Sequence, residues 1–185
     1  MPTNNANNVI VAGSGTVYVG PTTTPAPTNI ATALNAGFNE LGFVSEEGAT
    51  FTESKDITDI NAWQSFYAIR KIVNSRSVQV SFALREYNKR TIEFALGGTV
   101  SVSGSEWTYV PPLPSATSEV SLVLAWLDGT KSYRLYFPRG IVTEAVESNL
   151  TRTAAADLPV TFTAVDPGGS TKIYTLFTND VAFSS

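Results

Sequence analysis

The sequence predicts a mainly β fold with one helix packed beside the strands. Alternating apolar and polar residues recur in short segments, and breaks rich in Gly, Pro and Ser separate these segments; this is the pattern of half-buried strands. Only one stretch of the chain changes to helical spacing. A chain of 185 residues has the size of a single domain, so we expect residues 1–185 to form one α+β or mainly β sandwich.

The clearest strand is "SVQVSFAL", residues 77–84. Val78, Val80, Phe82 and Leu84 alternate there with polar or small residues, which predicts a strand with one buried face.

A β-hairpin is predicted where two further alternating segments, 120–126 and 133–137, flank a turn at Asp128-Gly129. The remaining strands are expected in segments rich in β-branched and aromatic residues, namely 9–19, 43–55, 106–110, 140–148, 158–166 and 171–180.

The predicted helix covers residues 88–96, in "YNKRTIEFALGG". Tyr87, Thr91 and Phe94 fall at helical spacing. Asn88 is a suitable N-cap, and the pair Gly97-Gly98 supplies a left-handed stop.

Three segments fit neither pattern. Residues 1–8 are polar and rich in Asn, so we expect a flexible N-terminal arm. Residues 20–30 are rich in Pro and Thr and predict a loop or arm, because Pro removes backbone donors. Residues 56–76 predict a long loop, since charges and amides interrupt its apolar residues at almost every step.

The composition limits the class of protein. Hydrophobic residues make up 43% and charged residues 15% of the chain, and the mean hydropathy is +0.03, which is typical of globular proteins. The net charge is −4, whereas proteins that bind nucleic acid tightly usually carry a basic excess. The chain has no Cys and no His, which excludes disulfides, thiolate metal sites and Ser-His-Asp catalysis within it.

Targeting signals are not expected either. The first residues have no basic leader and only a short apolar run at 9–12, which argues against a signal peptide. No segment reaches the roughly 18–20 apolar residues of a membrane-spanning helix.

An enzyme, a cofactor site or a metal site is not predicted. The acidic residues fit solvated strand faces better than a paired-carboxylate site. The segment "DITDIN", residues 56–61, lacks the ligand pattern and the Gly of a calcium loop. "AGSGTVYVG", residues 12–20, lacks the third Gly and the helix of a phosphate-binding loop.

The aromatic residues divide into two groups. Most of them, including Trp107, Tyr109 and Trp126, fall on strand positions and are expected in the core, with a sugar-binding platform as the alternative. Trp63, Phe66 and Tyr67 lie instead in the unpatterned segment, where they indicate a protein–protein surface.

The chain from Leu41 to Gly98 resembles the major tail tube protein of long, non-contractile-tailed (siphovirus-type) bacteriophages, especially those that infect actinobacteria. The resemblance is carried by the order of the pieces "LGFVSEEGATFT", "DITDINAWQS", "SRSVQVSFAL" and "YNKRTIEFALGG". It continues in "YRLYFPRGIVTEAVESNLTRTAAADLPVTFTAVDP" and spans most of residues 38–180.

This resemblance implies a structural virion protein without enzymatic activity. Family members fold as a barrel-like sandwich of two sheets with a flanking helix and form six-fold rings that stack into a tube. DNA passes through the tube into the host without specific binding. The implied partners are further copies of the chain, a tape measure protein, the tail tip and a tail terminator protein, with the virion tail as the location and the host cytoplasm as the place of assembly.

Two sets of site residues follow from the resemblance. The contact with a neighbouring subunit or ring is expected at Trp63, Phe66, Tyr67 and Ile69. An acidic lumen wall, which would repel DNA phosphates, is expected at Glu53, Asp56, Asp59, Glu144 and Glu147; ion pairs between subunits, with Lys55, Arg70, Arg76 or Arg152, are the alternative role for some of these carboxylates.

Two other classes of protein fit the sequence less well. A tail terminator or a decoration protein is also a virion β-sandwich, but it would not polymerise axially. A carbohydrate-binding β-sandwich would present aromatic residues such as Trp107 or Tyr109 on one exposed face.

Overall fold

The protein is described by a computed structural model that covers residues 4–144 and 147–184. The described part is mainly β, which confirms the predicted fold class. Ten strands and one α-helix occur there, with the bounds β1 Ser14–Pro21, β2 Asn39–Glu40, β3 Val44–Ile60, β4 Arg70–Leu84, α1 Lys89–Leu96, β5 Thr99–Ser103, β6 Glu106–Val110, β7 Val120–Asp128, β8 Lys131–Val142, β9 Leu158–Ala164 and β10 Thr175–Thr178. Two short 3-10 helices lie near the ends of the chain, Ala6–Asn8 and Val181–Ser184.

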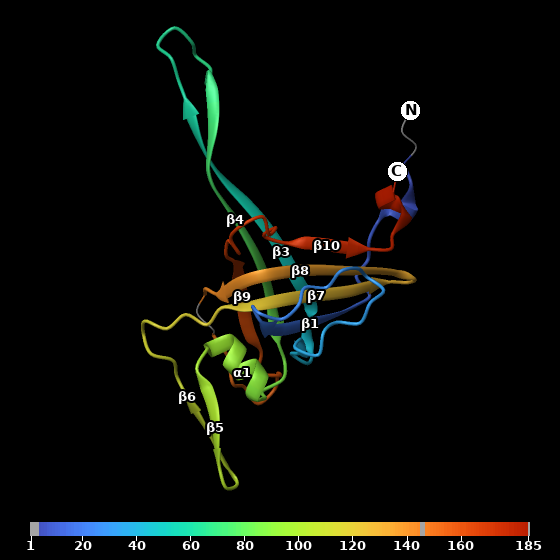
Figure 1. Ribbon diagram of the computed structural model, residues 1–185, viewed down its shortest axis with the longest axis vertical. Coiled ribbons are helices and arrows are strands. Elements are labelled where there is room, and N and C mark those ends of the chain that lie inside the picture. The colour runs from blue at the N-terminus through green and yellow to red at the C-terminus, as the bar shows by residue number, and fades with distance from the viewer. Residues whose placement is uncertain (1–3, 145–146, 185) are drawn as a thin grey trace.

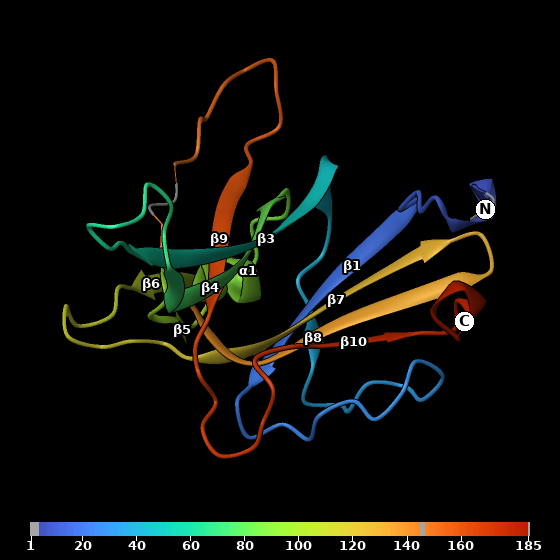
Figure 2. The same ribbon diagram turned by 90° about the horizontal axis from the view of Figure 1, so that it is seen from above.

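Eight of the strands form one antiparallel sheet that folds over on itself. Its order is β2-β1-β7-β8-β9-β4-β3, and β10 pairs with the first half of β8. β8 contacts β9 only at its end, from Gly140 to Val142. Figure 2 shows the result: β1, β7, β8 and β10 lie on one side, and β3, β4 and β9 on the other. This is the arrangement of a β-sandwich.

The core lies between these two halves of the sheet. Val17, Leu122 and Phe137 contribute from one half, and Val80 and Phe162 from the other, all with 1% or less of their surface exposed. The rings of Phe137 and Phe162 meet edge to face, with 5.7 Å between their centroids. The predicted burial of alternate residues in 77–84 is confirmed, because Val78, Val80, Phe82 and Leu84 are buried.

Helix α1 is confirmed at the predicted position. The side-chain oxygen of Asn88 accepts hydrogen bonds from the backbone N–H groups of Arg90 and Thr91, at 2.9 and 3.1 Å. The Thr91 hydroxyl accepts in turn from the Asn88 N–H at 2.9 Å, which completes a reciprocal cap. Gly97 and Gly98, with φ of 69° and 71°, end the helix.

The segment 56–76 is a strand–loop–strand excursion, and its loop is shorter than predicted. β3 continues to Ile60 and β4 begins at Arg70, so only residues 61–69 are loop. The register shifts between Asp56 and Ile57, which leaves Asn74 without a partner opposite it. This β-bulge interrupts the two-residue period, and for that reason the sequence shows no clean alternation here.

Some smaller expectations were wrong. The first strand begins at Ser14 rather than Val9. Trp107 is exposed rather than buried, because β5 and β6 form a separate two-stranded sheet away from the core. The strand expected over 140–148 ends at Val142 as part of β8, and residues 145–146 lie outside the described residues.

The expected arms lie on the surface. Within 1–8, residues 4–8 include the turn Ala6–Asn8, and residues 1–3 lie outside the described residues. The Pro/Thr-rich segment begins in β1 and continues as a loop to β2. Arg134 ties this loop to β8, since its guanidinium donates to the carbonyl oxygens of Asn29 and Thr32 at 2.7 and 3.0 Å.

Candidate assembly surfaces

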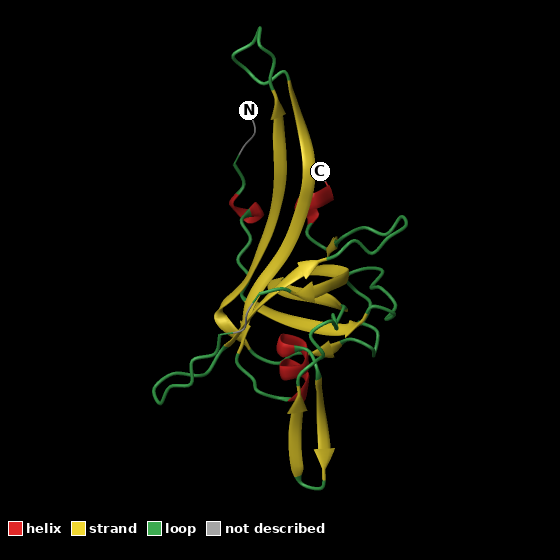
Figure 3. Ribbon diagram, turned by 90° about the vertical axis from the view of Figure 1, so that its left-hand side faces the viewer, coloured by secondary structure: helices red, strands yellow, loops and turns green. Residues whose placement is uncertain are grey.

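The outer half of the β3–β4 hairpin projects from the body of the protein (Figures 1 and 3). β9 pairs with β4 only as far as Gln79, so Arg70–Val78 continues without a third strand. At about 3.3 Å per residue, this part of the hairpin extends about 30 Å beyond the sheet. An isolated two-stranded hairpin is marginally stable in water, which indicates that a partner stabilises it.

The tip of this hairpin brings together the four predicted contact residues. Trp63, Phe66, Tyr67 and Ile69 have exposed fractions of 101%, 106%, 85% and 61%. Large apolar groups exposed together mark a surface that binds another molecule.

The tip has a defined shape, although it is exposed. The Ser65 hydroxyl donates to the carbonyl of Tyr67 at 2.9 Å and accepts from its N–H at 3.2 Å. The N–H of Ile69 donates to the carbonyl of Ile60 at 2.8 Å and closes the loop. A preorganised loop loses less conformational entropy on binding than a flexible loop.

The edge of β3 is a second open surface. β3 stands at the end of the strand order, and no strand in the described part of the chain pairs with its outer side. It runs from Val44 to Ile60, and nearly all of its residues are exposed. Soluble proteins usually shorten or cover such an edge, because its free N–H and C=O groups can pair with another chain.

The outward face of β3, β4 and β9 is lined by hydroxyl groups. Gln79 donates to the Thr163 hydroxyl at 3.1 Å, and the hydroxyls of Ser81 and Thr161 are 3.1 Å apart. The same face, which we call the hydroxyl face, carries Thr50, Thr52, Ser54, Thr58, Ser75, Ser77 and Thr143, as the strand register shows. Short uncharged side chains of this kind make a smooth polar wall.

The five acidic candidates do not share one face. Asp56 lies on the hydroxyl face and accepts from the Asn74 amide at 3.1 Å, and Glu144 accepts there from the Thr161 hydroxyl at 2.7 Å. Glu53 and Asp59 lie on the opposite side of β3, which continues the core face. Glu147 is exposed in the loop before β9.

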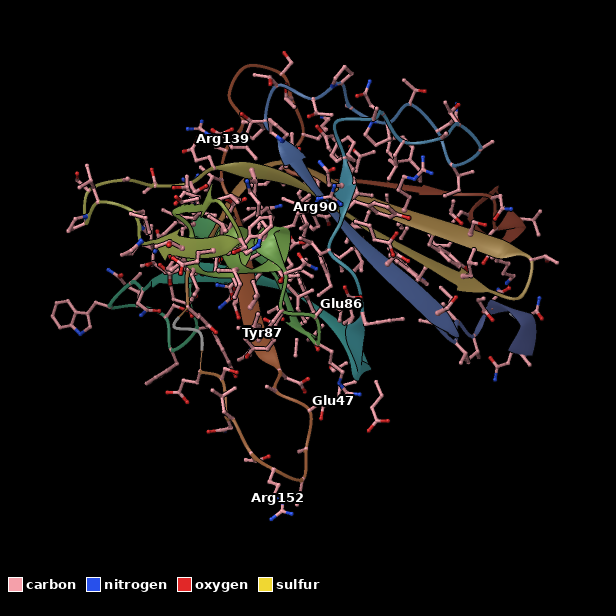
Figure 4. All side chains as sticks on the ribbon, turned by 90° about the horizontal axis from the view of Figure 1, so that it is seen from below. Glu47, Glu86, Tyr87, Arg90, Arg139 and Arg152 are labelled. Carbon is pink, nitrogen blue, oxygen red and sulfur yellow. The ribbon has the colours of Figure 1, made fainter. Side chains whose placement is uncertain are left out.

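Asp59 and Glu53 also have partners within the chain. Asp59 forms an exposed ion pair of 2.6 Å with Lys71 on its own hairpin, a partner within the chain rather than one of the residues expected to pair across subunits. Glu53 accepts from the Tyr174 hydroxyl at 3.1 Å. Burial and this hydrogen bond raise the pKa of Tyr174. Arg152, considered as another partner, lies at the tip of the loop before β9 (Figure 4).

A groove at the other end of the molecule was missed by the sequence analysis. Helix α1 and the β5–β6 hairpin enclose a space of about 550 Å³. Figure 4 views this end, with Arg90 on the helix and Tyr87 just before it. The groove is lined by Tyr87, Asn88, Lys89, Ile92, Leu96, Val100, Trp107 and Tyr109. The hint in the sequence was a second strip of apolar residues on the helix, Ile92 and Leu96, which a single buried face does not need.

Polar contacts link the two walls of the groove. The N–H of Val100 donates to the Glu93 carboxylate at 2.7 Å, and the Tyr109 hydroxyl donates to the Leu96 carbonyl at 3.2 Å. Trp107 and Leu96 remain exposed, with fractions of 66% and 42%.

Residues 4–144 and 147–184 show neither a metal-binding cluster nor a membrane-spanning helix. No group of three or more Asp or Glu side chains is placed there to hold a metal ion. None of the described helices has the length and apolar character needed to cross a membrane.

The projecting hairpin, the open strand edge and the sandwich together define a structural protein that associates with other chains. The family of phage tail tube proteins matches residues 2–185, and the chain belongs to this family. It is therefore a structural component of a virion tail.

No curated protein matches the chain. Among solved structures, a chain from the virion of a native gene transfer agent particle is similar at 10% identity and a TM-score of 0.41, over 96% of this chain and 100% of that chain.

Proposed function

We propose that this chain forms six-fold rings that stack into the tail tube through which DNA enters the host cell. The observation that supports the proposal most directly is the projecting hairpin with its exposed aromatic tip. A hairpin of this kind has little stability by itself and exposes three aromatic rings to water, which is not expected in a domain that functions without a partner. A neighbouring subunit or ring supplies the missing contact in this proposal.

The ring itself would close through strand edges. The outer edge of β3 needs a partner along Val44–Ile60, and a closed barrel of strands from several subunits removes such edges. The contacts would be heterologous, because a head-to-tail surface either closes into a ring or continues as a filament.

The hydroxyl face would then line the lumen. It is the side of β3, β4 and β9 that does not cover the core, and its charged groups are the carboxylates of Asp56 and Glu144 and, near the tip, the guanidinium of Arg70. A wall that is hydroxylated and acidic does not capture phosphates, so DNA slides past it. In this arrangement Glu53 and Asp59 face away from the lumen, so fewer of the five expected carboxylates would lie on the lumen wall.

The proposal also covers the setting of the tube. Residues 1–185 would act as one tail tube domain, with 1–8 and 20–30 as arms toward neighbouring rings. The phage would be of the siphovirus type and of the actinobacteriophage group, as the sequence motifs indicate. The tape measure protein, the tail tip and the tail terminator protein would be partners, and assembly would take place in the host cytoplasm.

Negative-stain microscopy of the concentrated protein tests this function. We expect rings or hollow cylinders of uniform width from the native chain. A variant in which Asn-Gly replaces residues 61–69 should fold, because Asn-Gly suits a two-residue hairpin turn, yet form no tubes. Leu150→Ser, which changes an equally exposed apolar residue elsewhere, is the control and should assemble normally.

Normal tubes from the shortened hairpin would contradict the role of the tip. A native chain that stays monomeric at every concentration would contradict the tube function as a whole. Rings that never stack would point instead to a tail terminator.

A further inference from the structure

The two apolar surfaces without an occupant lie at opposite ends of the molecule. Figures 1 and 3 show the β3–β4 hairpin at one end of the longest axis and the β5–β6 hairpin at the other, next to helix α1. One surface is a convex tip carrying Trp63 and Phe66, and the other is the groove lined by Leu96 and Trp107. Copies aligned along this axis bring the tip of one toward the groove of the next.

The size and chemistry of the two surfaces agree. The groove of about 550 Å³ has room for more than one aromatic ring, and its aromatic lining suits edge-to-face contact with Trp or Phe. The loop 61–69 contains no charged residue, so it enters an apolar groove without burying a charge.

The hairpin behind the tip is basic, whereas the charges on the two walls of the groove balance. Beyond Glu53, the β3–β4 hairpin carries four basic residues against two acidic ones, namely Lys55, Arg70, Lys71 and Arg76 against Asp56 and Asp59. The walls of the groove carry Glu93 and Glu106 against Lys89 and Arg90. The positive charge of the β3–β4 hairpin disfavours contact between two tips, and the balanced charges of the groove do not repel a tip.

We propose that the groove between α1 and the β5–β6 hairpin receives the β3–β4 tip of a second copy of this chain. This inference rests on the proposed function, and it assigns the receiving surface of the ring-to-ring contact. It also explains the β5–β6 hairpin, which is a separate two-stranded sheet outside the core and would be stabilised by the docked tip.

A second apolar cavity is the alternative receptor. It has about 470 Å³ and lies between the halves of the sandwich, lined by residues that include Phe51, Trp126, Tyr174 and Leu176. Phe51 belongs to β3 itself, so this cavity lies at the base of the same hairpin rather than at the opposite end of the molecule. A tip arriving along the long axis therefore meets the groove.

Disulfide trapping tests the contact without interference, because the native chain has no cysteine. Phe66→Cys would be mixed in equal amounts with Leu96→Cys, concentrated to the conditions of assembly and oxidised mildly. The two positions lie at opposite ends of one molecule, so a disulfide between them joins two copies. We expect a heterodimer as the main product, in roughly tenfold excess over the control mixtures, since docking raises the effective concentration of the two thiols.

Two control mixtures set the background and test the alternative. Phe66→Cys with Leu150→Cys pairs the tip with an exposed residue outside the groove, and Phe66→Cys with Leu176→Cys probes the second cavity. In a double variant that carries both Phe66→Cys and Leu96→Cys, the product should be a ladder of linked chains rather than a dimer, because each copy has both ends.

Each outcome decides the question. Tubes together with cross-linking no stronger than background would overturn the groove as receptor and leave the tube function standing. Cross-linking through Leu176→Cys instead would move the receptor to the second cavity. Monomers with no cross-link in any mixture would overturn both the groove as receptor and the tube function. An oligosaccharide that binds the groove, with binding abolished by Trp107→Ala, would also overturn both.

Discussion

The hydroxyl of Tyr133 donates a hydrogen bond of 2.6 Å to the carboxylate of Asp180 in the interior of the protein. Lys131 contacts the same carboxylate oxygen at 3.0 Å, and the N–H of Ala182 donates to the other oxygen at 3.0 Å. Tyr133 also stacks on Trp126, with 5.2 Å between the ring centroids. This buried carboxylate thus links the C-terminal segment after β10 to β8, beside the hydrogen bonds that join Asn179 to Ser132.

Because of this carboxylate, we expect the stability of the protein to decrease at acidic pH. The hydrogen bond from Tyr133 lowers the pKa of Asp180 to about 2 from its usual 3.8. A lowered folded-state pKa contributes stability above pH 3.8 that is lost as the pH falls toward 2. Thermal unfolding should therefore show a lower Tm for Asp180→Asn at pH 7 and a difference that shrinks as the pH approaches 2.

Asp59→Asn is the control for that experiment. It removes an exposed ion pair with Lys71, and such pairs contribute about 0–1 kcal/mol, so its Tm should stay close to that of the native chain. An unchanged Tm for Asp180→Asn at pH 7 would show that the carboxylate does not hold the C-terminal segment.

The hydrogen bond between Tyr133 and Asp180 also predicts a loss of stability at alkaline pH. The hydrogen bond to Asp180 raises the pKa of Tyr133 to about 12. A raised folded-state pKa contributes stability below the ordinary pKa of 10 that is lost as the pH rises toward 12. Tyr133→Phe keeps the ring and removes the titrating hydroxyl, so its unfolding curve should lack this alkaline component; an identical alkaline decline in both proteins would contradict the assignment.

The helix cap gives a prediction with a defined size. Asn88→Ala removes the acceptor for the N–H groups of Arg90 and Thr91, and such a loss costs about 0.5–2 kcal/mol. Urea denaturation should show this decrease in the free energy of unfolding. Asn88→Ser retains a capping oxygen and should lose much less, so equal losses in both variants would exclude capping as the cause.

Gly140 lies where a side chain has no room. A Cβ there would overlap the ring of Phe162 and approach the Thr163 carbonyl oxygen within 2.6 Å. Phe162 is fully buried and cannot move away at low cost, so Gly140→Ala should destabilise the protein by about 1–3 kcal/mol. Gly13→Ala, whose Cβ would find its nearest neighbour at 3.8 Å, should change the free energy of unfolding little. A larger loss of stability for Gly13→Ala than for Gly140→Ala would show that the sheet bends freely at β8.

Local patterns predicted the parts of this fold that local physics determines. The alternation in 77–84 and the capping signals around 88–96 depend on neighbours within one element, and both predictions were confirmed. The bulge at Asn74 depends on the pairing of two strands, so the sequence alone showed a broken pattern rather than a longer hairpin.

The candidate surfaces divide in the same way. Trp63, Phe66 and Tyr67 were predicted as a contact surface because their segment had no core pattern, and the structure places them together on an exposed tip. The groove was missed, because Leu96 and Trp107 come from different elements and only the folded chain brings them together. The alternation of Thr and Ser in β3 was visible, but the face they line requires the register with β4 and β9.

The hydroxyl face gives a prediction about DNA in the assembled tube. Asp56→Lys combined with Glu144→Lys turns two carboxylates of that face into cations in every subunit. Repeated around and along a tube, these cations would bind phosphates and release counterions, so DNA should be retained at low salt and released as the salt concentration rises. The measurement is co-sedimentation of short duplex DNA with preformed tubes over a salt series. Glu40→Lys combined with Asp166→Lys makes the same change of charge outside the hydroxyl face, and equal retention by both double variants would show that this face is not the lumen wall.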